Sequence, residues 1–239
     1  WAAEGRDVGA GGVGRLVGGA GDARAADVGV HVATVGAAAG RLGQPRLSIR
    51  PYPSGWQRRL ITRDGACLDI QPIRPEDEPD YKVFLESIDP DDLRLRFFAP
   101  LRHIGHAMLA RLTQLDYARA MAFVAKDPAT GEIQGSVRLH ADPDHRVGEY
   151  AILLRSNLKG KGLGWALMSL IIEYARADGL EEIVGEVLRE NTTMLALCTA
   201  LGFSVTPVPD DDGLVEVRLP VAQTDILFHD HLRQLHSPA

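Results

Sequence analysis

Several features that point to common functional classes are scarce or missing in this 239-residue sequence. Its two cysteines, Cys67 and Cys198, lie far apart without CxxC spacing, which argues against a disulfide framework and a zinc cluster. A net charge of −6 gives no overall basic footprint for nucleic acid or an anionic membrane. No apolar run approaches the ~18 residues of a membrane span. We therefore expect a cytoplasmic protein with no metal, no nucleic-acid partner and no membrane partner.

The two ends of the chain differ in composition from its middle. Residues 1–45 hold about half of the 25 glycines and no Ile, Phe, Tyr or Met, so they have little apolar surface to offset chain entropy. We expect a disordered or weakly ordered Gly/Ala-rich leader there, a proline-containing linker at 46–65, a folded domain at 66–220 and a tail at 221–239. The first residue is Trp1, which fits a fragment, a processed product or a mis-framed start.

Within 66–220, hydrophobic periodicity predicts an α+β domain. Alternating apolar residues indicate strands at 67–73, 120–126, 133–142, 147–155 and 181–188, and a closing β pair at 203–208 and 214–220. Helical spacing indicates helices at 75–87, 90–98, 105–115, 163–178 and 192–200. Pro72 suggests an edge position or a bulge in the first strand, because proline cannot donate to a sheet.

A glycine-rich turn joins the strand at 147–155 to the helix at 163–178. It reads SNLKGKGLGWALM from Ser156 to Met168, with Gly160, Gly162 and Gly164 spaced by two. Glycines let backbone N–H groups approach an anion closely, and the unpaired N–H groups of a helix start supply donors. The junction therefore predicts a phosphate site.

Two familiar phosphate loops do not fit this turn. A Walker A loop needs Ser or Thr after its lysine, but Gly162 follows Lys161. A GxGxxG dinucleotide fingerprint needs a glycine or alanine three residues after Gly162, where Trp165 stands. Neither ATP nor NAD is indicated.

The segment Lys159-Gly160-Lys161-Gly162-Leu163-Gly164 resembles the (Gln/Arg)xxGx(Gly/Ala) pyrophosphate loop of the Gcn5-related N-acetyltransferase (GNAT) superfamily. Lys159 replaces the usual Gln or Arg, a mild departure because the family's pyrophosphate contacts are mainly backbone amides. The resemblance extends over about residues 66–220. It implies a mostly antiparallel central sheet, splayed at the cofactor strand and flanked by helices, with acetyl-CoA as cosubstrate and Trp165 in the cofactor loop.

Further segments resemble the acetyltransferase domain of bacterial Pat-type protein lysine acetyltransferases. They are RLSIRPYP (46–53), IRPEDEPDY (73–81), RLRFFAP (94–100), LARLTQLDYARAMAFVA (109–125) and AILLRSNLKGKGLGWALM (151–168). This similarity implies a protein substrate with a target lysine, of the acyl-CoA synthetase type. It leaves the oligomeric state open.

The resemblance also implies roles for single residues. A lysine acceptor is protonated at neutral pH and needs a general base, and Glu149 matches the strand glutamate that serves as base in related enzymes. The alternative for Glu149 is a solvated strand residue, and Glu186 is the reserve base. Cys198 stands where the superfamily often has a tyrosine that protonates the leaving thiolate, and it is equally consistent with a small buried hydrophobe.

Backbone groups complete the expected cofactor site. Ile152, Leu153 and Leu154 are expected to pair with the pantetheine arm, with an N–H near Leu153 polarising the thioester carbonyl. Asn191 resembles the start of the second cofactor segment. Two other functions stay open: acetylation of a small amine, and a non-catalytic acyl-CoA-sensing module that regulates a partner.

Overall fold

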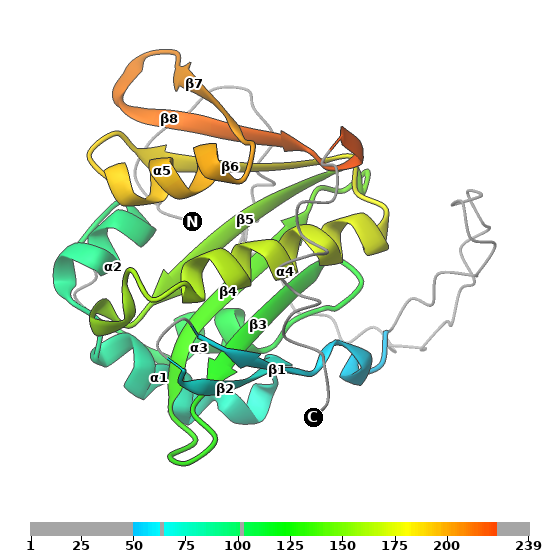
Figure 1. The fold of residues 1–239 in the computed structure, drawn as a ribbon, viewed down its shortest axis with the longest axis vertical. Coiled ribbons are helices and arrows are strands. Elements are labelled where there is room, and N and C mark those ends of the chain that lie inside the picture. The colour runs from blue at the N-terminus through cyan, green and yellow to red at the C-terminus, as the bar shows by residue number, and fades with distance from the viewer. Residues whose placement is uncertain (1–49, 63–64, 101–102, 224–239) are drawn as a thin grey trace, which may run out of the picture.

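A computed structural model describes residues 50–62, 65–100 and 103–223 (Figure 1). The predicted leader at 1–45 and residues 224–239 of the predicted tail lie outside the described residues. Among the described residues, none of the helices combines the length and the hydropathy that a bilayer crossing requires.

Most of the predicted elements are present with boundaries within three residues of those expected. The described strands are β1 (Arg58–Ile61), β2 (Cys67–Pro72), β3 (Ala120–Lys126), β4 (Ile133–Ala141), β5 (Val147–Leu154), β6 (Glu182–Leu188), β7 (Ser204–Val208) and β8 (Asp211–Pro220). The described α-helices are α1 (Glu78–Glu86), α2 (Pro90–Phe97), α3 (His106–Thr113), α4 (Leu163–Asp178) and α5 (Thr192–Ala200). Short 3-10 turns occupy Ser54–Trp56, Pro75–Asp77, Ser156–Leu158 and Val221–Gln223.

The strands form one sheet with the order β1-β2-β3-β4-β5-β6-β8-β7. Every neighbouring pair in it is antiparallel except β5 and β6, which run parallel because α4 crosses over between them. The prediction of a mixed, mostly antiparallel α+β sheet is confirmed.

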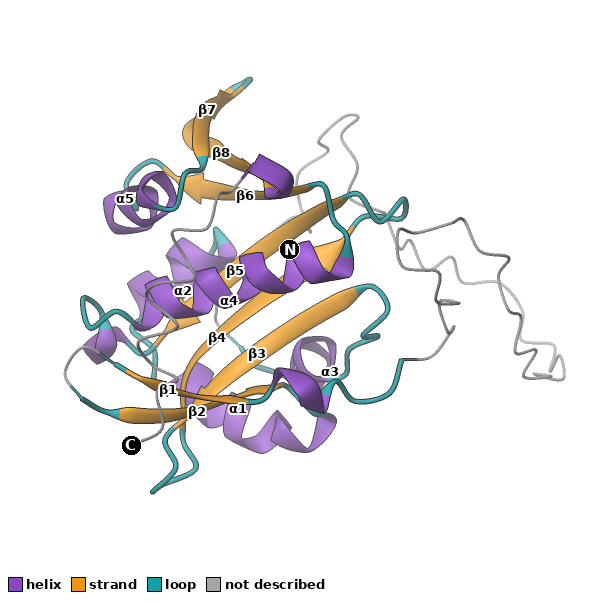
Figure 2. Ribbon diagram, turned by 45° about the vertical axis from the view of Figure 1, so that its right-hand side comes forward, coloured by secondary structure: helices purple, strands orange, loops and turns teal. Residues whose placement is uncertain are grey.

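Helices cover both faces of this sheet (Figures 1 and 2). α4 and α5 pack on one face, where Met168 and Ile171 of α4 are fully buried against the strands. α1, α2 and α3 pack on the other face, where Phe84 and Leu85 of α1 are fully buried. Each such side chain contributes roughly 1.5–3 kcal/mol when removed from water. The helices packed on the two faces therefore stabilise the sheet between them.

Two expectations for the start of the domain are corrected by the structure. Residues 58–61, placed in the linker at 46–65, form β1 and pair with β2 from Arg58 opposite Ile70 to Ile61 opposite Cys67. β2 is therefore not an edge strand. Pro72 is tolerated because β1 begins opposite Ile70, so no strand of the described residues pairs with Pro72 on that side.

Candidate functional site

The glycine-rich turn presents an open backbone at the start of α4. Gly160 and Gly162 have φ values of 79° and 91°, in the left-handed region that favours glycine. The first hydrogen bond that closes back to the turn runs from the Ala166 N–H to the Gly162 carbonyl at 3.0 Å. The preceding N–H groups have no acceptor within the helix. Gly160 is exposed, and no described residue comes within 4 Å of where its Cβ would stand, so the turn leaves space for an anion.

Gly164 has a different purpose, which is close packing. A Cβ on it would stand 3.3 Å from Leu154 Cδ1 and 3.6 Å from Leu197 Cδ2. The first turn of α4 therefore sits directly against the end of β5 and against α5. Leu163 and Trp165 flank it, the first buried in the core and the second half-buried against it.

The two lysines of the turn differ in their surroundings. Lys159 forms an ion pair with Asp92 of α2, and the Ser156 hydroxyl donates to the same carboxylate at 2.7 Å. Asp92 therefore ties α2 to the turn and offsets the charge of Lys159. Lys161 is half-buried in the turn, and its N–H donates to the Leu158 carbonyl at 3.4 Å.

β5 and β6 separate next to this turn. They pair only from Val147 opposite Glu182 to Glu149 opposite Val184. β5 then stays paired with β4 up to Leu154, whereas β6 stays paired with β8 up to Leu188. Among the residues that the structure describes, the second half of β5 therefore has an open edge, which confirms the predicted splay at the cofactor strand.

The ring of Tyr150 accounts for the separation of the two strands. Tyr150 is the first residue of β5 after the pairing ends, and a Cβ on Gly185 of β6 would stand 2.5 Å from Tyr150 Cε1. The ring also packs against Phe203, with their centroids 5.6 Å apart. We infer that this buried ring acts as a wedge between the strands, and that glycine at 185 makes room for it.

Cys198 lies behind this wedge. Its thiol is fully buried, 3.1 Å from the Tyr150 hydroxyl, and burial raises the pKa of the thiol. Burial likewise raises the pKa of Tyr150. This arrangement favours the interpretation of Cys198 as a buried packing residue over its interpretation as a proton donor at the open edge.

Alternation along β5 decides which backbone groups face the open edge. The Arg155 N–H donates to Gln134 of β4 at 3.0 Å, and Leu153 stands opposite Ser136 in the same register. Since successive residues point to opposite sides, Leu153 directs its N–H and C=O to β4, while Ile152 and Leu154 direct theirs to the open edge. The contact of an N–H near Leu153 with the thioester therefore stays a prediction, and it applies to Ile152 or Leu154, because the Leu153 N–H itself faces β4.

Glu149 lies on the face of the sheet that α1–α3 cover, opposite the face of α4. It is exposed, and its cross-strand neighbour is His140 of β4. Glu186 of β6 lies two residues beyond Val184, the partner of Glu149, and so on the same face. Desolvation and the charge of Glu149 raise the pKa of Glu186. The two predicted base candidates are thus neighbours.

Three cationic or titratable side chains near Glu149 are absent from the sequence prediction: Arg96 of α2, and Arg138 and His140 of β4. Desolvation and the charge of Arg138 lower the pKa of His140. The position of His140 could have been found from the sequence. A short turn joins the strands at 133–142 and 147–155, and if residues 142 and 147 pair across it, His140 stands opposite Glu149. No sequence signal places Arg96 there.

Asn191 caps α5 at the far side of the splay. Its side-chain oxygen accepts from the Met194 N–H at 3.1 Å, which fixes the start of the helix. The NH2 group of the same amide is not used by the cap. Next to it, Glu190 pairs with Arg94 of α2 at 2.6 Å, so α2 contacts both sides of the splay.

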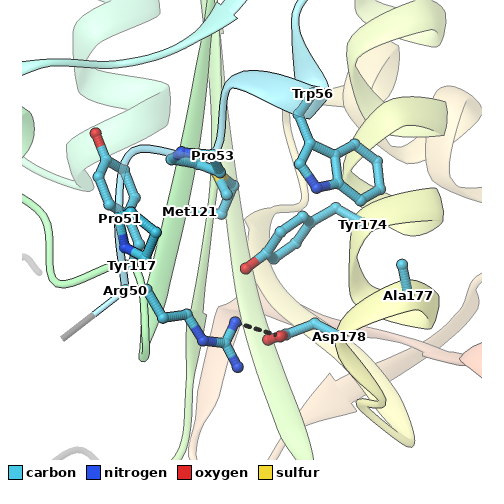
Figure 3. Close-up of a pocket in the computed structure, with 9 residues that line it drawn as sticks. All are labelled: Arg50, Pro51, Pro53, Trp56, Tyr117, Met121, Tyr174, Ala177 and Asp178. Atoms are coloured by element: carbon cyan, nitrogen blue, oxygen red, sulfur yellow. Dashed lines mark hydrogen bonds and ion pairs between the residues drawn. The ribbon is translucent and has the colours of Figure 1, made fainter. Parts of the chain in front are cut away.

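A pocket of about 240 Å³ lies elsewhere, at the C-terminal end of α4 (Figure 3). Trp56, Tyr117 and Tyr174 line it, together with Asp178, which accepts from Arg50 at 2.6 Å. The rise of a helix places the two ends of α4 about 22 Å apart. This pocket is therefore separate from the glycine-rich turn, and its charged groups are already paired with each other.

Comparisons with known proteins agree with this geometry. The model of the acetyltransferase (GNAT) family matches residues 81–203. The acetyltransferase PA5475 of Pseudomonas aeruginosa is 32% identical over 158 residues, which are 65% of this chain and 85% of that protein. The acetyltransferase Pat of Mycolicibacterium smegmatis is 25% identical over 213 residues, which are 88% of this chain. This chain spans only 61% of the length of Pat.

A solved structure gives the same result. The crystal structure of the GNAT domain of S. lividans PAT superposes with a TM-score of 0.66 and 25% identity, covering 71% of this chain and 99% of that domain. An open turn at a helix start, a splayed parallel pair and a family match over more than half of the chain therefore coincide. The chain belongs to the GNAT acetyltransferase family.

Proposed function

We propose that this chain transfers the acetyl group of acetyl-CoA, the donor of the family, to the side-chain amine of a protein lysine, with acyl-CoA synthetase-type enzymes as targets. One observation carries the proposal: β5 has an open edge between Tyr150 and Leu154, with Glu149 just before it and the open turn just after it. The similarity to Pat supports a protein acceptor. A cytoplasmic location and the absence of a metal stay predictions.

The residues present fit coenzyme A. The N–H groups from Gly162 to Trp165 would hold its diphosphate, helped by the helix dipole of α4. The backbone groups of Ile152 and Leu154 would pair with the amides of the pantetheine arm, as an added strand does. The NH2 group of Asn191 is a further donor from the β6 side.

Glu149 is the proposed base. A lysine ammonium has a pKa near 10.4, so it must lose a proton before its nitrogen attacks the thioester carbonyl. The exposed Glu149 carboxylate accepts this proton directly or through a water. The C–N bond then forms and a backbone N–H of β5 stabilises the negative oxygen. The C–S bond breaks to release the thiolate, and the extra proton on the attached nitrogen passes to that thiolate or to water, which leaves a neutral amide. Coenzyme A thiolate is a good leaving group and needs no strong acid.

The proposal is tested with Glu149→Gln, using labelled acetyl-CoA and a panel of acyl-CoA synthetases. Transfer should fall by about 10²–10⁴-fold, because the amide cannot take up the proton, while acetyl-CoA binding is retained. Glu86→Gln, an exposed change at the C-terminal end of α1 that only removes the ion pair with Lys82, is the matched control and should leave transfer unchanged.

Three results separate the alternatives. Label on small amines but on no protein lysine would assign a small-molecule acceptor. Tight acetyl-CoA binding with no transfer by the unaltered protein would assign the sensing module. Full transfer by Glu149→Gln would remove Glu149 as the base.

A further inference from the structure

Two arginines without acidic partners lie beside Glu149. Arg138 of β4 stands opposite Ala151 of β5 and two residues from His140, the cross-strand neighbour of Glu149. It therefore shares the face of the sheet on which Glu149 lies. Arg96 comes from the last turn of α2, which packs against β5 on that face. Both are half-buried, and both lie within electrostatic reach of Tyr81 of α1.

Neither guanidinium has a carboxylate within ion-pair distance in the described part of the chain. Arg96 stacks over the Phe97 ring at 4.9 Å, and the Nη2 of Arg138 reaches the Arg111 carbonyl only at 3.5 Å. Arg94, on the same helix, pairs with Glu190 at 2.6 Å. A half-buried cation without a partner is unfavourable, so this face favours an incoming anion.

The pKa values of Arg96, Arg138 and His140 are all lowered. Burial and the charge of Arg138 lower the pKa of Arg96 to about 10, although the charge of Glu149 opposes them. Burial also lowers the pKa of Arg138. The pKa of the neighbouring His140 is lowered by desolvation and by the charges of Arg138 and Arg119, against the charge of Glu149. The two arginines thus lie where negative charge is in short supply.

Positive and negative groups are separated on this face. Arg96 and Arg138 lie toward α2 and β4, whereas Glu149 and Glu186 lie on β5 and β6. Residues two apart on a strand are about 7 Å from each other. The cross-strand pair that contains Arg138 is therefore displaced by about 7 Å from the pair that contains Glu149. An acceptor that presents an amine to Glu149 can therefore place a neighbouring anion on the arginines.

We propose that Arg96 and Arg138 bind a carboxylate of the acceptor, so that the preferred acceptor carries an acidic group beside its reacting amine. This inference rests on the proposed function, because it assigns Glu149 to the amine. Two sources supply the same chemistry: an acidic side chain next to a protein lysine, and the α-carboxylate of a small amine.

The experiment compares acceptors that differ only in this charge. One pair is a lysine peptide with Glu on both sides of the lysine and the same peptide with Gln. The other pair is free lysine and lysine amide. Transfer is measured as kcat/KM with acetyl-CoA, and binding by calorimetry in the presence of coenzyme A. The unaltered protein should prefer the carboxylate member of one pair about tenfold or more, as expected for a charge-assisted hydrogen bond.

Arg96→Gln and Arg138→Gln, singly and together, should bring that ratio close to one. Arg59→Gln is the matched control, since Arg59 is exposed on β1 and pairs with Asp69 at 3.1 Å. For each variant, both acceptors of a pair are measured with the same preparation. Partial unfolding then lowers both kcat/KM values equally and leaves their ratio unchanged. The pair that shows the preference identifies the source of the anion.

Failure of the inference and failure of the proposed function give different results. Transfer without a preference in either pair overturns the inference and keeps the function. A preference that survives in the double variant also overturns it. A binding preference that the double variant loses, with no transfer to any acceptor, supports the anion site and overturns the proposed function. Equal binding and no transfer overturn both.

Discussion

Gly185→Ala tests the inferred origin of the splay. The added Cβ would stand 2.5, 2.9 and 3.0 Å from three ring carbons of Tyr150. Carbon atoms in ordinary contact are about 3.5–4.0 Å apart, so the ring must move by about 1 Å. It cannot do so freely, because Phe203 and the Cys198 thiol hold it.

The magnitude follows from this overlap. Inserting a methyl group into a packed site costs about 1–3 kcal/mol. For a domain of this size, 1 kcal/mol lowers Tm by about 2–4 °C, so Gly185→Ala should lower Tm by roughly 2–12 °C. Because the displaced ring moves within the splay, the variant should also bind acetyl-CoA more weakly.

Thermal unfolding and calorimetry with acetyl-CoA measure both effects. Gly55→Ala is the control, because within the described part of the chain no atom comes within 4 Å of where its Cβ would stand. In a Tyr150→Ala background, where the clash is absent, Gly185→Ala should change stability by less than about 0.5 kcal/mol. If Gly185→Ala matches Gly55→Ala, or if its cost persists without the Tyr150 ring, the wedge explanation is refuted.

Two further predictions concern buried polar groups. Asp178 accepts from Arg50 at 2.6 Å and lies 2.9 Å from His145. Although burial opposes them, the hydrogen bonds from these two side chains hold the pKa of Asp178 below its ordinary value. The stability that Asp178 contributes is therefore present above pH ~4 and is lost as the pH falls through its folded-state pKa. Asp178→Asn should lower the free energy of unfolding at pH 7 by ~2 kcal/mol and flatten the acid limb of a curve of Tm against pH. An unchanged acid limb would contradict this assignment. Cys198→Ser keeps a hydrogen-bond partner for Tyr150, so kcat should stay within about twofold; a fall of 10²-fold or more would restore Cys198 as the general acid.

The parts of the fold that depend on local pattern could be predicted from the sequence. The glycine spacing from Gly160 to Gly164 predicted the open turn at the start of α4, because positive φ and an open helix start are local properties. The boundaries of β3 and α4 match those expected because their apolar periodicity is strong. By contrast, the strand Arg58–Ile61 is short and lies among prolines and charged residues, and only its pairing with β2 makes it a strand.

The parts of the site that depend on register and on contacts distant in sequence could not be predicted. Whether Leu153 faces β4 or the open edge depends on hydrogen-bond alternation, which a single strand does not reveal. The burial of Cys198 behind Tyr150 joins residues 48 apart in the sequence. Arg96 reaches the Glu149 face because α2 packs against β5, a contact between elements far apart in the chain.

Amide hydrogen exchange with and without coenzyme A tests the central claim most directly. In the free protein the Ile152 and Leu154 amides should exchange fast, because they face the open edge, and the Leu153 amide slowly, because it faces β4. Coenzyme A should slow exchange at Ile152, Leu154 and residues 162–165 and leave Leu153 unchanged. Fast exchange at Leu153 in the free protein, or no protection of the turn and the β5 edge by coenzyme A, would contradict the account.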